Sequence, residues 1–306
     1  MRDAFSTALV NLATADSNVL LLTGDHGYAL FDGFRSVCPD QYINAGIAEQ
    51  NMVGMAAGLA RTGFRPIVYG LSAFVPVRVL EQIKLDVAHD MLPVIFIGDG
   101  AGFVYSHLGT SHQSTEDIAC TRAVPDLQVY SPADAYEITL CMKSAYQSRA
   151  PVYLRMGKSD RGSVHQQVPD TPLGGLIALQ HSEPGCVSFI ATGSLTRCAL
   201  DIATYTFPEA SVWSAPFIKP LDVSQIINIC HSSRAIVTFE EHSIHGGLGS
   251  LVAEIASEHA PVRILRVGVR DRFSEHCGTY EYLLKEHGLD RDSIEKQILT
   301  FLSKTN

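Results

Sequence analysis

Hydrophobic residues along the chain fall into short β-branched runs that alternate with longer stretches of helical period. The strand-like runs are 18–25, 65–71, 92–100, 126–132 and 151–157. Helical stretches begin at Glu49 and cover 75–90 and 133–148. This alternation is typical of a parallel α/β sheet with helices on both faces. Such sheets bind ligands at the carboxyl ends of their strands.

The pattern is interrupted from about residue 158 by a polar stretch rich in Gly and Pro, which is typical of a connecting segment. Beyond it the alternation resumes, with strand-like runs at 186–194, 211–221, 234–243 and 262–271 and helical runs at 246–260, 279–286 and 293–304. We therefore predict an α/β domain at 1–165, a linker at 166–184 and a smaller α/β domain at 185–306.

Length and charge narrow the class of protein. A chain of 306 residues with 46% hydrophobic composition predicts a soluble globular protein of two domains. A formal charge of -9, with scattered Lys and Arg, argues against nucleic acid as a partner. The charged N-terminus and the absence of an apolar run of about 18 residues argue against secretion and membrane insertion. Seven cysteines without a C-x-x-C pair favour a reducing compartment, so we expect a cytoplasmic protein.

The stretch INAGIAEQNMVGMAAGLARTG, residues 43–63, places Glu49 at the head of a helix of small and apolar residues. A carboxylate in the first turn is explained in part by the helix dipole. Gly54 and Gly58 are not explained that way, because each costs about 1 kcal/mol in a helix interior. We expect another subunit or a cofactor to approach this helix closely.

The motif around Glu49 and four further motifs, ordered along the chain, give it a family resemblance. The stretch 43–63 resembles the motif around the catalytic glutamate of transketolases and their thiamine diphosphate relatives. Residues 21–35, 69–83 and 100–134 resemble the first strand, the aromatic cofactor segment and the substrate-side loop of the transketolase pyrimidine-binding domain. EEHSIHGGLGS, residues 240–250, resembles a motif of the C-terminal domain. The implied fold is a parallel-sheet thiamine diphosphate pyrimidine-binding domain followed by a smaller α/β transketolase C-terminal domain.

The resemblance implies roles for the cofactor segment. Glu49 would hydrogen-bond N1′ of the aminopyrimidine, so that the 4′-nitrogen can remove the proton from C2 of the thiazolium. Phe74 would stack on the pyrimidine ring, although a core Phe before a helix is an equally good structural interpretation. Leu71 and Arg78, in the same segment, are expected beside the cofactor.

Substrate contacts are implied for four further residues. His112, in GTSHQ, matches a histidine that contacts substrate oxygens and assists proton transfer, so it is a candidate for both catalysis and substrate binding. Arg155 resembles an arginine that binds a sugar phosphate, but a strand-end arginine can equally be a surface charge. His107 and Asp25 are further substrate candidates, and an exposed loop imidazole is an equally good interpretation of His107.

Two departures from the family pattern bear on the substrate. Leu108 stands where transketolases have an aspartate that reads a substrate hydroxyl, and Gly100 stands where they often have a histidine. Their loss argues against an ordinary pentose or hexose phosphate donor.

The diphosphate-binding half of the expected active site is missing. Gly98, Asp99 and Gly100 form the G-D-G sequence, but no asparagine follows before Asn228, so we predict a turn there and no metal site in this chain. The resemblance then implies a separate N-terminal subunit that supplies the diphosphate ligands and a Mg or Ca ion. An α2β2 heterotetramer acting on a small sugar is the expected assembly, with the helix after Glu49 at an interface.

Other functions remain open. Beta subunits of 2-oxo acid dehydrogenases share the layout, and transfer to a carrier-bound thioester is a hybrid alternative. Deoxyxylulose phosphate synthases share motifs but are usually longer single chains. A non-catalytic scaffold subunit is an alternative of another class. The weakest is a metal enzyme built on His242, His245 and the adjacent Glu240 and Glu241, because H-x-x-H lacks helical i, i+4 spacing. GGLGS at 246–250 opens a helix that suits an anion, although close packing explains its glycines better.

Overall fold

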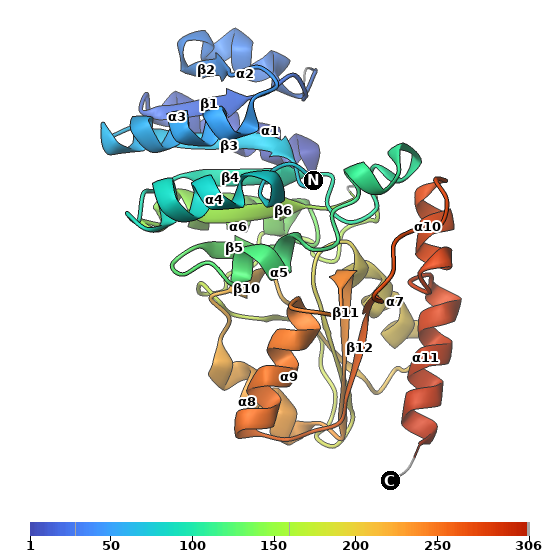
Figure 1. Ribbon diagram of the computed structural model, residues 1–306. Helices are drawn as coiled ribbons and strands as arrows, with labels where there is room; N and C mark the ends of the chain where they lie inside the picture. The colour runs from blue at the N-terminus through green and yellow to red at the C-terminus, as the bar shows by residue number, and fades with distance from the viewer. Residues whose placement is uncertain (28, 159, 305–306) are drawn as a thin grey trace.

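The computed structural model describes residues 1–27, 29–158 and 160–304. Two α/β units lie end to end, each built on its own sheet, and the C-terminus lies at the far end of the second unit (Figure 1). Within the described residues, none of the helices has both the length and the apolar character that crossing a membrane requires.

The first unit contains a seven-stranded sheet in the order β10-β5-β6-β4-β3-β1-β2. All neighbouring strands are parallel except β10, which runs antiparallel to β5. The strands are β1 (Val19–Thr23), β2 (Tyr42–Asn44), β3 (Arg65–Leu71), β4 (Ile95–Asp99), β5 (Gln128–Tyr130), β6 (Val152–Met156) and β10 (Phe217–Lys219). The central strands β1, β4 and β6 are buried at every position, as expected for parallel strands covered on both faces.

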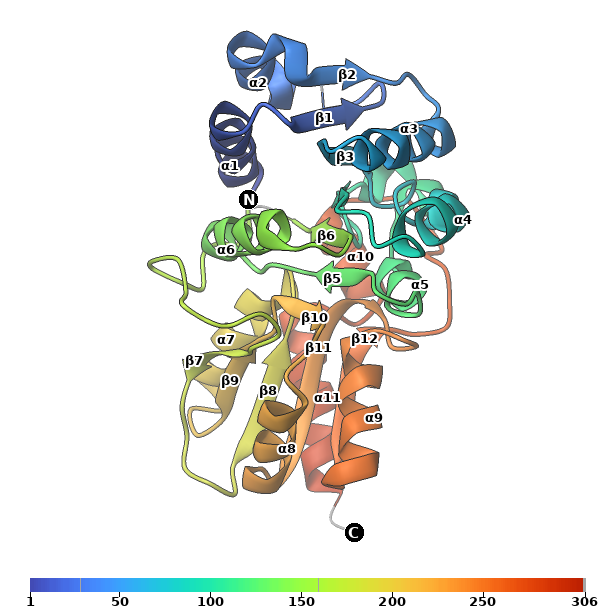
Figure 2. The ribbon, with the colours of Figure 1, turned by 90° about the vertical axis from the view of Figure 1, so that its left-hand side faces the viewer.

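Helices cover both faces of this sheet, as Figure 2 shows. One face is covered by α1 (Arg2–Ala15), α2 (Asp32–Val37) and α6 (Ala135–Gln147). The other is covered by α3 (Glu49–Arg61), α4 (Leu80–Gln82), which continues as a π-helix over Ile83–Ala88, and α5 (Asp117–Arg122). Asp134 caps α6 by accepting the amides of Tyr136 and Glu137, which satisfies two of the free donors at the start of that helix.

The second unit contains a five-stranded sheet in the order β12-β11-β8-β9-β7, in which only β7 is antiparallel to its neighbour. Its strands are β7 (Ile177–Gln180), β8 (Val187–Ala191), β9 (Ser211–Ser214), β11 (Ala235–Ser243) and β12 (Ile264–Val269). Its helices are α7 (Leu195–Thr206), α8 (Val223–Ser232), α9 (Leu248–His259), α10 (Tyr280–Glu286) and α11 (Arg291–Ser303).

Three strands differ from the sequence prediction. β2 falls outside every predicted strand, in the stretch just before Glu49. β7 falls inside the stretch predicted to be a linker, and it is a half-exposed edge strand whose residues show no buried run. β10 falls in the sequence of the second unit but completes the sheet of the first. The chain therefore crosses back into the first unit between β9 and α8, and the two units share a sheet edge.

Candidate functional site

Glu49 is the first residue of α3, and its side chain is only 6% exposed. Its Oε2 accepts a hydrogen bond from Nη1 of Arg78 at 3.1 Å. The positive end of the helix dipole also favours a carboxylate at this position. Glu49 is thus a nearly buried acid held by one half-exposed cation.

Phe74 and His112 join this pair into one cluster. The guanidinium carbon of Arg78 lies 4.0 Å from the ring centroid of Phe74. The Phe74 ring meets the imidazole of His112 edge-on, with centroids 5.3 Å apart. We call Glu49, Phe74, Arg78 and His112 the Glu49 cluster; it brings together three of the sequence motifs.

Backbone turns at the strand ends place these side chains. The amide of Phe74 donates to the carbonyl of Leu71, the last residue of β3, so the chain turns immediately after the strand. Arg78 follows in the 3-10 turn Val77–Val79. Leu71 therefore sets the position of Phe74 through its backbone, at the edge of the sheet where ligands of parallel α/β folds bind.

His26 is a candidate site residue that the sequence pattern did not indicate. It follows β1 directly, and its ring centroid lies 5.9 Å from that of Tyr69. Burial lowers the pKa of His26, and the negative charge of Glu49 opposes that shift. Its buried Nε2 has no hydrogen-bond partner of normal geometry among the described residues. The only available signal was its place next to Asp25 at the end of a predicted strand; Asp25 itself is exposed.

The loop that carries His112 is largely open to solvent. His107 and Leu108 are exposed, in the 3-10 turn Ser106–Leu108. His112 ends a second turn, Thr110–His112, and its Nδ1 lies 3.0 Å from the hydroxyl of Ser111. Within the described structure neither His107 nor Leu108 is part of the Glu49 cluster.

Arg155 lies outside the Glu49 cluster, and its burial contradicts its interpretation as a surface charge, while its role toward a phosphate stays a prediction. Its side chain is 2% exposed. Its Nε donates to Asp117 at 2.8 Å, and its Nη2 donates to the carbonyls of Glu241 at 2.7 Å and Ser114 at 3.3 Å. The guanidinium is occupied by protein acceptors that join the two units.

The G-D-G sequence is a structural turn. Asp99 is buried and accepts hydrogen bonds from Arg2 and from the hydroxyls of Tyr69 and Tyr105. Gly100 has φ +78°, and a Cβ there would lie 2.0 Å from the Tyr105 ring. No group of three or more potential metal ligands occurs in the part of the chain that the structure describes.

Glu240, Glu241 and His242 have structural partners as well, whereas the side chain of His245 is exposed. Glu240 accepts the amides of Leu248 and Gly249, both at 2.8 Å, so the chain's own carboxylate occupies the start of α9. Burial raises the pKa of Glu240 to about 7. His242 accepts the amide of Ala119 at Nε2, and burial lowers its pKa to about 4.

The outward face of α3 carries the unexplained glycines. Gly54 and Gly58 are exposed, and a Cβ at either would meet no described atom within 4 Å. Nothing in the described part of this chain approaches them. Ile47, just before the helix, is 78% exposed. The close approach that the glycines predict is not made by any described residue and stays a prediction.

Comparisons with known proteins agree with this architecture. Residues 1–162 match the model of the transketolase pyrimidine binding domain, and residues 178–294 match that of the transketolase C-terminal domain. The chain is 33% identical to an apulose-4-phosphate transketolase subunit of Phocaeicola vulgatus, over 99% of this chain and 97% of that one. It is 32% identical to the 6-deoxy-6-sulfo-D-fructose transketolase subunit SqwH of a Clostridium species, over 96% and 92%. A solved structure described as a split gene transketolase, an inactive beta4 tetramer, superimposes with a TM-score of 0.88 at 33% identity, over 99% and 97%.

Proposed function

Because this chain belongs to the transketolase family, we propose that it is one subunit of a two-component, thiamine diphosphate-dependent transketolase. It would transfer a two-carbon ketol unit from a ketose or ketose phosphate to an aldehyde or related acceptor. The observation that carries this proposal is the Glu49 cluster, in which a nearly buried carboxylate lies beside an accessible aromatic ring and an imidazole. The two relatives of nearly equal length, both described as transketolase subunits, support it.

The residues present fit the aminopyrimidine end of the coenzyme. Glu49 offers a carboxylate that accepts a hydrogen bond from Arg78. Phe74 offers an aromatic ring that lies against the guanidinium of the same arginine. Glu49, Phe74, Leu71 and Arg78 would hold the coenzyme, and a partner subunit would hold its diphosphate and a Mg or Ca ion. When bound, thiamine diphosphate would supply a carbon nucleophile that bonds to the ketose carbonyl and a cationic ring that can accept the electron pair of the broken carbon–carbon bond.

The chain's own residues have separate tasks in this proposal. Glu49 shares a proton with the pyrimidine in a site with little water, where such an interaction is stronger than in bulk solvent. Arg78 covers both Glu49 and Phe74 in the chain alone, so we expect its side chain to move aside as the coenzyme binds. His112 lies against the edge of Phe74, where it can exchange protons with substrate oxygens.

The substrate side is less polar than in ordinary transketolases. Leu108 is 47% exposed on the loop where an aspartate that reads a substrate hydroxyl is expected. Its side chain has no donor or acceptor, so it cannot hydrogen-bond a sugar. His107, Asp25 and His112 remain as polar groups for the substrate, whereas Arg155 is buried and directs its Nε and Nη2 at protein acceptors. This set favours a donor that carries fewer recognised hydroxyls or a different terminal group.

The open face of α3 supports assembly with other chains. Gly54 and Gly58 leave its backbone accessible, and Ile47 adds an exposed apolar side chain. We propose that this face meets a second pyrimidine unit, and that a partner subunit completes an α2β2 enzyme in the cytoplasm.

The test is reconstitution with a partner that carries the G-D-G and asparagine motif. Ketol transfer to an aldehyde acceptor is expected, without a lipoyl carrier. Glu49→Gln should abolish turnover, whereas Glu258→Gln, at a side chain 73% exposed in the second unit, should not. Transfer only to a lipoyl carrier would favour the 2-oxo acid dehydrogenase alternative. Unchanged turnover in the Glu49→Gln complex would favour the scaffold.

A further inference from the structure

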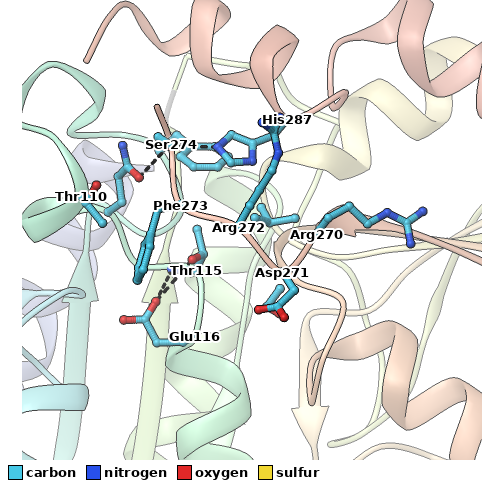
Figure 3. A pocket seen from close by; sticks show the side chains of 13 residues that line it. Thr110, Thr115, Glu116, Arg270, Asp271, Arg272, Phe273, Ser274 and His287 are labelled. Carbon is cyan, nitrogen blue, oxygen red and sulfur yellow. Dashed lines mark hydrogen bonds between the residues drawn. The ribbon is translucent and has the colours of Figure 1, made fainter. Parts of the chain in front are cut away.

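The second unit reaches the loop of His112 through a chain of polar side chains. Figure 3 shows a cavity of about 490 Å³ between this loop and the segment that follows β12. In its wall, the hydroxyl of Ser274 donates to Oε1 of Gln113 at 2.9 Å. The same hydroxyl lies 2.9 Å from Nε2 of His287. Gln113 is the residue after His112.

The direction of these hydrogen bonds follows from the number of protons. A serine hydroxyl has one proton, and Ser274 gives it to Gln113, so Nε2 of His287 must be the donor to Ser274. Burial lowers the pKa of His287, which favours the neutral ring, and the hydrogen bond to Ser274 then requires the ring's one proton to be on Nε2. The imidazole is itself held by stacking on Phe103, with centroids 4.7 Å apart. Each side chain in the series Gln113, Ser274, His287 and Phe103 is therefore oriented by the next one.

We propose that Ser274 and His287 are positioning residues for His112, and that this is a task of the second unit in the reaction. The inference rests on the proposed function, since it takes His112 to be the residue that exchanges protons with substrate. Gln113 is 7% exposed, whereas Ser111, on the other side of His112, is far more open to solvent. The buried amide of Gln113 is thus the anchor next to an otherwise open turn.

The backbone around His112 depends on this anchor. The amide of His112 donates to Gly109 at 3.0 Å, and that of Gln113 to Thr110 at a longer 3.3 Å. One residue on, Ser114 exchanges two backbone hydrogen bonds with Gly102. Loss of the Ser274 hydroxyl leaves both polar ends of the Gln113 amide without a side-chain partner among the described residues, because its Nε2 already has none there. The turn is then free to shift, and His112 moves relative to Phe74.

The test compares Ser274→Ala with Ser274→Thr, which keeps the hydroxyl, and with Ser243→Ala. Ser243 lines the same cavity but lies outside the chain of hydrogen bonds. In hydrogen–deuterium exchange on the full chain, we expect Ser274→Ala to speed exchange at residues 109–114 by about fivefold, the loss of about one hydrogen bond. Ser274→Thr and Ser243→Ala should match the wild type. Exchange in Ser274→Ala equal to that in Ser243→Ala would overturn the proposal.

In the reconstituted complex, kcat of Ser274→Ala should fall by about tenfold, since misplacement of a catalytic group is costly. KM for thiamine diphosphate should not change, whereas a general loss of structure would raise it. Turnover equal to that of Ser243→Ala would overturn the positioning role. A wild-type complex without ketol transfer would instead refute the proposed function, and the exchange experiment would still decide whether Ser274 holds the loop.

Discussion

Replacement of Arg155 by Met tests whether this arginine holds the two units together or binds substrate. Methionine retains much of the apolar stem but removes the charge and every donor. In the structure these donors reach Asp117, which is fully buried, and the carbonyls of Glu241 and Ser114. The substitution therefore leaves the carboxylate of Asp117 buried and without its cation. Among the described residues, its remaining side-chain hydrogen bond comes from the hydroxyl of Tyr153 at 2.6 Å.

The size of the effect follows from that buried charge. Removal of one partner of a buried ion pair typically costs about 3–5 kcal/mol, because the other charge stays desolvated. We expect the free energy of unfolding to fall by about that amount in Arg155→Met. Arg155→Lys should lose less, about 2 kcal/mol, because an ammonium can still pair with Asp117 but cannot reach two carbonyls in the same geometry.

Urea unfolding followed by circular dichroism measures this difference. Arg197→Met is the matched control, since Arg197 forms an i, i+4 ion pair with Asp201 and its side chain is 40% exposed. Such surface ion pairs contribute under about 1 kcal/mol to stability. A fall in Arg155→Met no larger than in the control would refute the structural role. A raised KM for a phosphorylated donor with unchanged stability would restore Arg155 as a substrate ligand.

Three further predictions concern pH, assembly and the coenzyme. Burial raises the pKa of Glu240 from 4.5 to about 7, so the folded state keeps a proton that the unfolded state has released, and stability falls as pH rises through that window. Burial lowers the pKa of His242 from 6.5 to about 4, so stability rises with pH between those values. The two effects on the free energy of unfolding oppose each other, so each variant isolates one of them. In urea unfolding, the free energy of unfolding of His242→Gln should fall by about 3 kcal/mol from pH 4.5 to 7, whereas that of Glu240→Gln should rise. Free energies that change in the same direction with pH in both variants would contradict both assignments. Gly54→Leu should stabilise the isolated chain by about 1 kcal/mol, because the glycine penalty is removed where nothing clashes, yet should weaken self-association in sedimentation experiments; an intact oligomer would place the interface elsewhere. Phe74→Ala should weaken thiamine diphosphate binding to the reconstituted complex by about fivefold in a calorimetric titration, in keeping with a lost aromatic contact of about 1 kcal/mol; unchanged affinity would argue that the pyrimidine lies elsewhere.

Sequence reasoning predicted the elements that local pattern determines. The alternation of strands and helices, and the order of the five motifs, led to the α/β fold and the transketolase family, which the comparisons confirm. The close contact of Phe74 with His112 is consistent with the expected site, but the roles of these residues stay predictions.

Long-range partners explain what the sequence pattern did not show. Arg155 has the same local pattern whether it faces water or Asp117, which lies 38 positions away. β10 is a short apolar run like any other, and only its pairing with β5 assigns it to the first sheet. His26 gave no periodic signal, because its environment is made by Glu49 and Tyr69 from two other elements.

The crossing of β10 into the first sheet has a practical consequence for anyone who divides this protein. A fragment that stops at the end of β6 would lack β10 and expose the backbone donors and acceptors of β5 along a bare sheet edge. Bare edges recruit strands from other molecules, so such a truncated piece is prone to aggregate. A stable half-protein would have to keep the chain through Lys219, or carry a grafted copy of its last strand.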